Sequence, residues 1–238
     1  MTQTHIHTDA DLDVGLAALR RADPRFAALL AIAGRPPLRR RPDGFAGLAA
    51  IIVAQQLSTA SAGAIWGRLA EAFDPLDPDA IRRARATRLA RLGLSAPKIR
   101  ALKEIARAVL RGELALATLA DLPADTAHAA LTAVHGIGPW TADIYLLSCL
   151  GHADAWPAGD LALQEAARLA FALPARPTAK EMQAMAEPWR PWRAVAARVL
   201  WTYYRAAAVT KSAAGRTARV GRPKARGTGN RNLRRTHR

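Results

Sequence analysis

The sequence has a single cysteine, Cys149, among its 238 residues. One thiol cannot form a disulfide within the chain, and it cannot hold a four-cysteine iron–sulfur cluster. The six histidines are also placed without the helical pairing that is typical of zinc sites. We therefore expect no internal disulfide, no catalytic metal and no cofactor.

Long apolar runs and alternating β-branched residues are missing as well. No apolar stretch approaches the length of a membrane span, so we expect no membrane partner. The first residues lack both the basic and the apolar region of a secretory signal, which makes a cytoplasmic location the default expectation. Hydrophobic residues make up 50% of the chain, and the apolar positions recur at helical spacing. The fold class is therefore predicted to be all-α.

Acidic residues are missing from the last part of the chain. The formal net charge is +16, and residues 211–238 contain no Asp or Glu. A segment with this charge and few apolar groups cannot offset its own folding entropy, so we expect a disordered basic tail. Such a tail would bind a polyanion through counterion release. The alternative is a solubilising extension, which would have the same composition. The ten basic residues of the segment are Lys211, Arg216, Arg219, Arg222, Lys224, Arg226, Arg231, Arg234, Arg235 and Arg238.

The sequence does contain a series of amphipathic helical patterns, separated by Gly, Pro and capping residues. Leu12, Leu16 and Leu19 form one apolar stripe. The pattern from Phe45 to Val53 predicts the main core helix of the first half. We find no internal repeat. The predicted helices are 9–22, 24–32, 45–55, 59–73, 79–85, 87–92, 97–110, 125–134, 139–150, 161–171, 179–186 and 191–208.

Two of these predicted helices are joined by a tight, glycine-containing loop at 135–138, and Pro139 begins the second helix. Glycine lacks a Cβ, so such a loop can take positive φ angles and approach another molecule's backbone closely. Pro139 suits the first helical position, which would leave the N–H groups of Ile137, Gly138 and Trp140 unpaired near a positive helix end. Such a helix start attracts phosphate and does not read base edges.

This stretch resembles the helix-hairpin-helix DNA glycosylase superfamily. The residues that carry the resemblance are Leu131-x-x-Val134-x-Gly136-Ile137-Gly138-Pro139-Trp140-Thr141-Ala142, followed by Asp160. Within the superfamily, Trp140 and the paired glycines are similar to the DNA-3-methyladenine glycosylase II branch, which removes alkylated bases from DNA. The resemblance implies that Gly136, Ile137, Gly138 and Thr141 bind the DNA backbone.

The resemblance also implies how the chain is divided. A glycosylase domain would span residues 1–210, as two helical subdomains with a cleft between them. One lobe would combine residues 1–40 with 155–210, and the other would span residues 41–154. The disordered basic tail would follow.

Asp160 has two interpretations. An Asp that follows Gly and precedes an apolar run is usually only a helix cap. In the resemblance it is instead the catalytic residue. Breaking an N-glycosidic bond builds positive charge on the sugar, and a nearby carboxylate stabilises that charge and can orient the attacking water. The position of Asp160 in the motif after Trp140 favours catalysis.

Three residues are expected to line a pocket for a flipped base. Trp140 stands where bifunctional members of the superfamily carry a nucleophilic lysine, so no Schiff base can form there and the enzyme would be monofunctional. Trp201 lies beside Arg198 and Arg205 on the last predicted helix, opposite its apolar stripe. It packs on the tail or the other lobe, or it stacks on an electron-deficient base, and the resemblance favours stacking. Ile144 stands where some members place a stacking tyrosine.

Gln56 or Leu57 is expected to fill the gap that a flipped nucleotide leaves in the duplex. The alternative is that residues 55–58 only form a polar helix end followed by a Ser cap. Three basic residues on the predicted 97–110 helix could meet phosphates, and an ordinary solvated face is the preferred explanation for them. These residues are Lys98, Arg100 and Lys103.

Together these patterns predict a monofunctional DNA glycosylase of base excision repair. It would bind damaged double-stranded DNA, flip out an alkylated base of the 3-methyladenine or 7-methylguanine type, and hydrolyse its N-glycosidic bond. The expected form is a monomer associated with the nucleoid, and the resemblance allows a monovalent cation in the hairpin loop. The alternatives are a bifunctional glycosylase/lyase acting on other lesions and a noncatalytic helix-hairpin-helix DNA-binding protein.

Overall fold

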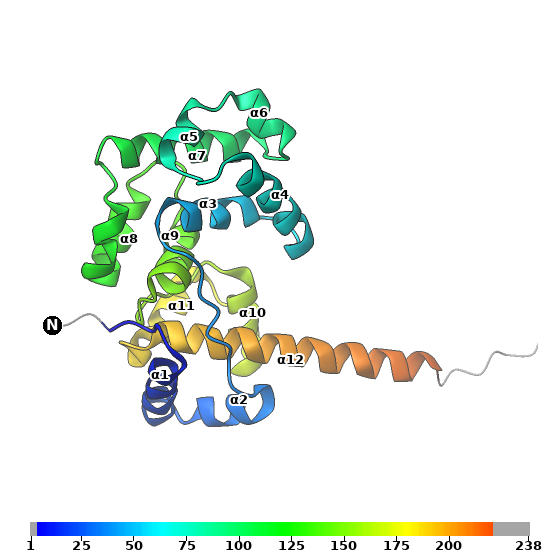
Figure 1. Ribbon diagram of the computed structural model, residues 1–238. Coiled ribbons are helices and arrows are strands. Elements are labelled where there is room, and N and C mark those ends of the chain that lie inside the picture. The colour runs from blue at the N-terminus through cyan, green and yellow to red at the C-terminus, as the bar shows by residue number, and fades with distance from the viewer. Residues whose placement is uncertain (1–3, 221–238) are drawn as a thin grey trace, which may run out of the picture.

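The computed structural model describes the backbone of residues 4–220 and the side chains of residues 4–208. Over this range the regular structure is helical, with one isolated antiparallel bridge between His5 and His152 (Figure 1). The predicted all-α class is therefore confirmed. The elements are α1 (Asp9–Ala22), α2 (Arg25–Ala33), α3 (Gly44–Ala54), α4 (Thr59–Ala72), α5 (Pro78–Arg83), α6 (Ala86–Arg91), α7 (Ala96–Leu110), η1 (Leu116–Asp121), α8 (Ala124–Thr132), α9 (Pro139–Tyr145), η2 (Leu146–Leu150), α10 (Leu161–Ala170), α11 (Ala179–Ala186), η3 (Glu187–Trp189) and α12 (Arg193–Val220).

Helix α12 is the centre of one group of helices, which lies in the lower part of Figure 1. It packs against α1, α2 and α10. A cluster of aromatic rings forms part of this core, where Trp189 meets Phe26, Trp156 and Phe171 at centroid distances of 5.1, 5.5 and 5.9 Å. The Trp189 indole donates to the buried Asp23 carboxylate at 3.0 Å, so the polar atom of this fully buried ring has a partner.

Helix α3 is the centre of a second group, in the upper part of Figure 1. It packs against α4, α7 and α9, and α5 and α6 lie on α7. Seven of its eleven residues are buried, among them Leu48, Ile52 and Val53. The prediction of a core helix in this segment is confirmed, and the end of that helix lies beside the functional site described below.

The ends of several helices follow local sequence signals. Thr8 begins α1 in a capping box with Asp11, and Thr178 begins α11 in the same way with Glu181. The short 3₁₀ turns η1 and η3 were not predicted, because a 3₁₀ helix has three residues per turn and lacks the 3.6-residue period of an α-helix.

The helix predicted over residues 139–150 is only partly regular. Helix α9 ends at Tyr145, and the chain continues as the π-helix η2, which closes at Gly151 with a φ of 79°. Within this segment the Ser148 hydroxyl donates to the Ile144 carbonyl at 2.5 Å. A hydroxyl that bonds the carbonyl four residues earlier competes with the regular helical ladder, so the apolar periodicity alone did not predict the widened turn.

Helix α12 is longer than predicted. The sequence placed its end near Ala208 and a disordered tail from Lys211, whereas the helix continues through Val220. Extending an existing helix needs no new nucleation, and the Ala, Arg and Lys residues that follow Ala208 favour helix. The rest of the expected tail, residues 221–238, lies outside the described residues. No helix in the described range, α12 included, is long and apolar enough to cross a membrane.

Candidate active site

The carboxylate of Asp160 is the polar centre of the candidate site. It caps α10, since Oδ1 accepts the Leu163 N–H at 2.7 Å. The same oxygen accepts the Trp201 indole N–H at 3.1 Å, and Oδ2 accepts the Trp140 indole N–H at 2.8 Å. Three donors from α9, α10 and α12 therefore fix one carboxylate. The capping interpretation is confirmed, and the carboxylate still faces an open cleft.

The loop that precedes Asp160 is held by its own hydrogen bonds. The Ala158 and Asp160 N–H groups donate to the carbonyls of Trp156 and Pro157 at 2.8 and 2.9 Å. The buried Gln164 side chain donates to the Ala158 carbonyl at 2.9 Å. None of these bonds involves the Asp160 carboxylate. The loop therefore keeps its shape while the carboxylate oxygens face the cleft.

The cleft beside Asp160 has a volume of about 750 Å³. One wall is formed by the start of α10, and the other by the hairpin loop and the end of α3. It brings Asp160 and Trp140 together with all four residues expected to bind the DNA backbone and with one of the two wedge candidates. The lining residues are Gln55, Gln56, Gly136, Ile137, Gly138, Pro139, Trp140, Thr141, Gly159, Asp160, Leu161 and Ala162.

The hairpin loop packs closely on α7. Gly136 has a φ of 98°, and a Cβ at this position would lie 2.8 Å from the Cβ of Ala101. Both the backbone angle and the close approach require glycine. Ile137 is buried, and its N–H donates to the Val134 carbonyl at 3.1 Å. The prediction that this N–H stays unpaired is therefore wrong, because the tight turn closes onto the preceding helix.

The start of α9 offers fewer groups to a ligand than the sequence suggested. The amides of Gly138 and Trp140 find no acceptor in the described part of the chain, as expected for a first helical turn. Thr141 is buried, and its hydroxyl accepts the Gln55 side-chain N–H at 2.7 Å. This bond ties the end of α3 to the hairpin. Gln55 has no local sequence signal for the role, since its partner lies 86 positions away.

The two wedge candidates separate in the structure. Gln56 is exposed, has a φ of 56° and lines the cleft of Asp160. Leu57 is 39% exposed and lines a neighbouring cavity of about 380 Å³ together with Trp66. The sharp turn at Gln56 thus directs the two side chains to different hollows, and only Gln56 shares one with Asp160.

The interpretations offered for Lys98 and Lys103 are both wrong. The Lys98 ammonium donates to the carbonyls of Val53 and Gln55, each at 2.7 Å. Lys103 donates to the last carbonyls of α5 in the same manner. A cation at a helix C-terminus satisfies orphan carbonyls and complements the helix dipole. Arg100 is exposed, as expected. The pattern along α7 predicted the outward direction of these side chains but not the helix ends that lie beneath them.

The pocket expected from Trp140, Trp201 and Ile144 is divided in two. Trp201 and Ile144 line a smaller cavity of about 180 Å³, whereas Trp140 lines the larger cleft. Trp201 connects the two spaces, because its indole N–H reaches Asp160 while its ring borders the smaller cavity.

Arg198, predicted to share a charged face with Trp201, is buried. Its guanidinium donates to the carbonyls of Ala194 and Leu147 at 3.0 Å and of Leu38 at 3.3 Å. Burial and the nearby Arg40 guanidinium lower the pKa of Arg198 to about 10. The face around Trp201 is therefore an internal contact with the segment before α3, and a helical wheel could not show this.

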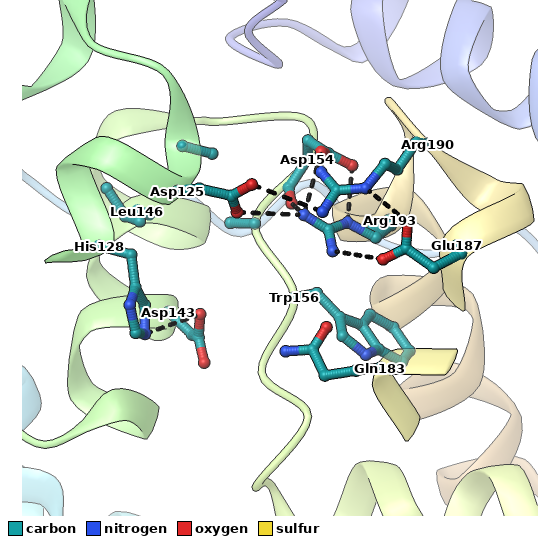
Figure 2. A pocket seen from close by; sticks show the side chains of 12 residues that line it. Asp125, His128, Asp143, Leu146, Asp154, Trp156, Gln183, Glu187, Arg190 and Arg193 are labelled. Atoms are coloured by element: carbon teal, nitrogen blue, oxygen red, sulfur yellow. Dashed lines mark hydrogen bonds and ion pairs between the residues drawn. The ribbon is translucent and has the colours of Figure 1, made fainter. Parts of the chain in front are cut away.

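A fourth cavity, polar and of about 370 Å³, lies between α8, α9 and the start of α12 (Figure 2). On one wall the buried Arg193 guanidinium donates to the Asp154 carboxylate at 2.7 and 3.0 Å. Arg190 pairs with Asp154, with Glu187 at 3.1 Å and with Asp125 at 3.5 Å. This network joins α8 of the hairpin to the beginning of α12, so it fixes the hairpin relative to the helix that carries Trp201.

The opposite wall of this cavity carries His128 and Asp143, whose Nε2 and Oδ1 atoms lie 3.6 Å apart (Figure 2). Burial raises the pKa of Asp143 from 3.8 to about 8, against the opposing influence of Arg193. No sequence pattern singles out either residue, because they come together only when α8 packs on α9.

Comparisons with known proteins agree with this geometry. Residues 49–191 match the family model described as HhH-GPD superfamily base excision DNA repair protein. The chain is 29% identical to the DNA-3-methyladenine glycosylase of Bacillus subtilis over 216 residues, which cover 83% of this chain and 70% of that protein. It is 34% identical to a probable bifunctional transcriptional activator/DNA repair enzyme AlkA of Mycobacterium tuberculosis, covering 82% of this chain and 40% of that protein.

A similar fold occurs in a solved structure. The Schizosaccharomyces pombe 3-methyladenine DNA glycosylase Mag1, in complex with abasic DNA, superimposes with a TM-score of 0.71. The sequences are 28% identical, and the match covers 79% of this chain and 95% of that chain. The likeness therefore extends over most of the fold described above.

Proposed function

The chain belongs to the HhH-GPD superfamily of base excision DNA repair proteins, and from this premise we propose that it is a monofunctional glycosylase that excises alkylated bases from duplex DNA. The observation that carries the proposal is the Asp160 carboxylate, fixed by the indoles of Trp140 and Trp201 at the edge of a cleft whose other wall is the hairpin loop. The names of the relatives from B. subtilis and S. pombe support 3-methyladenine as one substrate.

In the proposed reaction Asp160 acts on the sugar of the flipped nucleotide. Positive charge develops at C1′ as the bond to the base breaks, and a carboxylate held nearby stabilises that charge. Water adds to C1′, its proton leaves through Asp160 to solvent, and the electron pair of the broken bond stays on the base. Since Trp140 and Trp201 hold one oxygen each, the carboxylate is positioned before the substrate arrives.

Water is the proposed nucleophile because no residue lining the cleft of Asp160 carries an amine. Trp140 stands at the position where bifunctional relatives have lysine, and Lys98 is bonded to the carbonyls of Val53 and Gln55. A Schiff base with the sugar needs a free amine at C1′. We therefore expect no covalent adduct when borohydride is added during turnover, and a trapped adduct would point to the glycosylase/lyase alternative.

The hairpin and the turn at Gln56 are the proposed DNA contacts. The unpaired amides of Gly138 and Trp140 suit a backbone phosphate, which carries no sequence information. Gln56 would enter the duplex where the target nucleotide has left, since it shares the cleft with Asp160 and Leu57 does not. We also propose that the protein acts as a monomer and associates with DNA in the nucleoid.

The experiment that tests the proposal measures the release of free 3-methyladenine and 7-methylguanine from methylated duplex DNA. Wild type and Asp160→Asn are compared in parallel, with DNA affinity measured for both. Release by wild type alone supports both the reaction and the role of Asp160. Binding without release by either protein would favour a noncatalytic DNA-binding protein, and equal release by both would remove Asp160 from the mechanism.

A further inference from the structure

The small cavity beside Trp201 has an apolar floor and a basic rim. Its volume is about 180 Å³, and Ile144, Leu147 and Trp201 provide flat and aliphatic surface. The rim carries the guanidinium groups of Arg39 and Arg205. An aromatic and aliphatic floor suits the face of a nucleobase, and a rim of donors suits its edge. The remaining lining residues are Pro37, Leu38, Arg41, Ser148, Arg198 and Thr202.

The cations on this rim have no acidic partner. Arg39, Arg41 and Arg205 are exposed, and none forms an ion pair within the described residues, whereas Arg35 is paired with Asp9 and Asp13. No acidic residue lines the cavity. The only side-chain bond found among the three runs from Arg205 to the Thr202 hydroxyl at 3.0 Å. The rim therefore presents unused N–H donors to whatever enters the cavity.

Two guanidinium groups of the rim also lie close enough to repel each other. Burial and the neighbouring Arg39 guanidinium lower the pKa of Arg205. Arg39 itself has a φ of 43°, in the left-handed region that residues other than glycine rarely adopt. Arg198 holds the segment before α3 in place through the carbonyls of Leu38 and Leu147. Strain and repulsion of this kind are typical of functional sites, where a ligand relieves them.

The cavity is connected to the Asp160 carboxylate through Trp201, whose indole N–H bonds to Asp160 and whose ring borders the cavity. In the proposed complex, the C1′ atom of the flipped nucleotide lies at Asp160 and its base lies against Trp201 and Ile144. In that position the edge of the base faces Arg39, Arg41 and Arg205. This step rests on the function proposed above.

We propose that Arg39, Arg41 and Arg205 are specificity-determining residues that favour damaged purines which are uncharged in DNA and carry a carbonyl acceptor on the edge, such as hypoxanthine. When a neutral purine departs, the C1′–N9 bond breaks, the electron pair stays on the base and the base leaves as an anion, which later takes a proton from water. Guanidinium groups at its edge stabilise that negative charge in the transition state.

Purines methylated at N3 or N7 behave differently. They are cationic in DNA and depart as neutral molecules, so a basic rim repels the bound base and offers its departure no comparable stabilisation. The rim thus favours excision of uncharged purines and disfavours excision of the cationic methylated purines. The inference predicts selectivity, and it does not depend on how fast either lesion is removed.

The test measures single-turnover excision from matched duplexes that contain one hypoxanthine or one 7-methylguanine. Wild type is compared with Arg39→Gln, Arg205→Gln and the double variant, and with Arg100→Gln as a control on the exposed face of α7. Each substitution on the rim should lower the ratio of hypoxanthine to 7-methylguanine excision by about tenfold, the value of one charge-assisted hydrogen bond. Arg205→Lys, which keeps the charge, should restore part of the ratio.

The outcomes are distinct. An unchanged ratio in the rim variants, or removal of 7-methylguanine but not hypoxanthine by wild type, overturns the inference and leaves the proposed function intact. An equal fall for both lesions, with weaker binding of undamaged duplex and a shallower salt dependence, would assign the arginines to backbone phosphates instead. If wild type removes neither base, this inference fails, and the proposed function fails with it when 3-methyladenine is not released either.

Discussion

Asp160 and Asp143 are the same residue type, one at the start of α10 and the other on α9, and their surroundings differ completely. The Asp160 carboxylate receives three N–H donors, from Leu163, Trp140 and Trp201, and faces an open cleft. Asp143 is largely enclosed, and its Oδ1 atom lies 3.6 Å from the Nε2 atom of His128. Burial accordingly raises the pKa of Asp143 to about 8.

The N–H donors around a carboxylate, and not its location alone, decide what that carboxylate can do. Asp160 is supplied with donors from three helices, so its charge can be used on a substrate. Asp143 lacks such donors, and the low dielectric around it favours the protonated form. The donors around Asp160 suit a carboxylate anion. The surroundings of Asp143 favour its protonated form.

Replacing each of the two acids by asparagine should separate the two sites most clearly. Asp160→Asn should lower excision of methylated bases by about 100-fold or more, since it removes the group that stabilises the transition state. Asparagine is also a good N-cap, so α10 should remain folded. Asp143→Asn should leave the excision rate within about twofold, as Asp143 has no contact with the cleft. Single-turnover kinetics on methylated duplex DNA measure both variants.

A smaller effect should follow from removing the donors around Asp160. Trp140→Phe and Trp201→Phe each delete one N–H bond to the carboxylate and should lower excision by about tenfold. The matched control is Trp156→Phe, whose indole donates to the Met182 carbonyl and not to Asp160. Loss of excision in the control to the same extent, at equal folded fraction by circular dichroism, would contradict the positioning role of the two indoles.

Next in size is the loss of the Lys98 bonds at the end of α3. Lys98→Met leaves two carbonyls without their donor and should lower the free energy of unfolding by about 2 kcal/mol. Urea denaturation measures it, and Arg100→Met on the exposed face of the same helix should change the value by less than about 0.5 kcal/mol. Equal effects of the two substitutions would show that the carbonyl contacts do not stabilise α3.

The last effect concerns Asp143 and the pH dependence of stability. Because the pKa of Asp143 rises from 3.8 to about 8 on folding, the folded protein holds an extra proton between these values. The free energy of unfolding should therefore fall as pH increases over this interval, and Asp143→Asn should remove that contribution. Urea midpoints at pH 5 and pH 8 test it. The variant should gain stability relative to wild type at pH 8, and a parallel pH dependence of the two proteins would contradict the assignment.

The sequence predicted the structural features that depend on residues close together along the chain. The all-α class, the ends of α1 and α7 and the loop at 135–138 follow from periodicity, caps and glycine, which act within one or two turns. The grouping of Asp160 with Trp140 was predicted from the motif and not from physics. The structure places these two side chains in contact.

Contacts between distant segments could not be predicted in this way. Gln55 and Thr141, Arg198 and Leu38, and the ion pairs of Arg193 each join residues that no periodicity relates. Outward-facing positions were also misread, since a solvated face and a face that covers another helix's end have the same polar pattern. Tertiary packing determines whether such side chains face solvent or another helix, and it overrides the local signal.

The lysine contacts at the ends of α3 and α5 have a consequence for chemical modification. Lys98 and Lys103 stabilise the fold through carbonyl groups, although their positions on α7 look like those of solvent-facing cations. Acetylation at either ammonium would remove the charge and the donors together. A loss of DNA binding after acylation of this protein would therefore indicate that α3 and α5 have loosened. Protection of Lys98 or Lys103 from acylation by bound DNA would not identify them as DNA contacts.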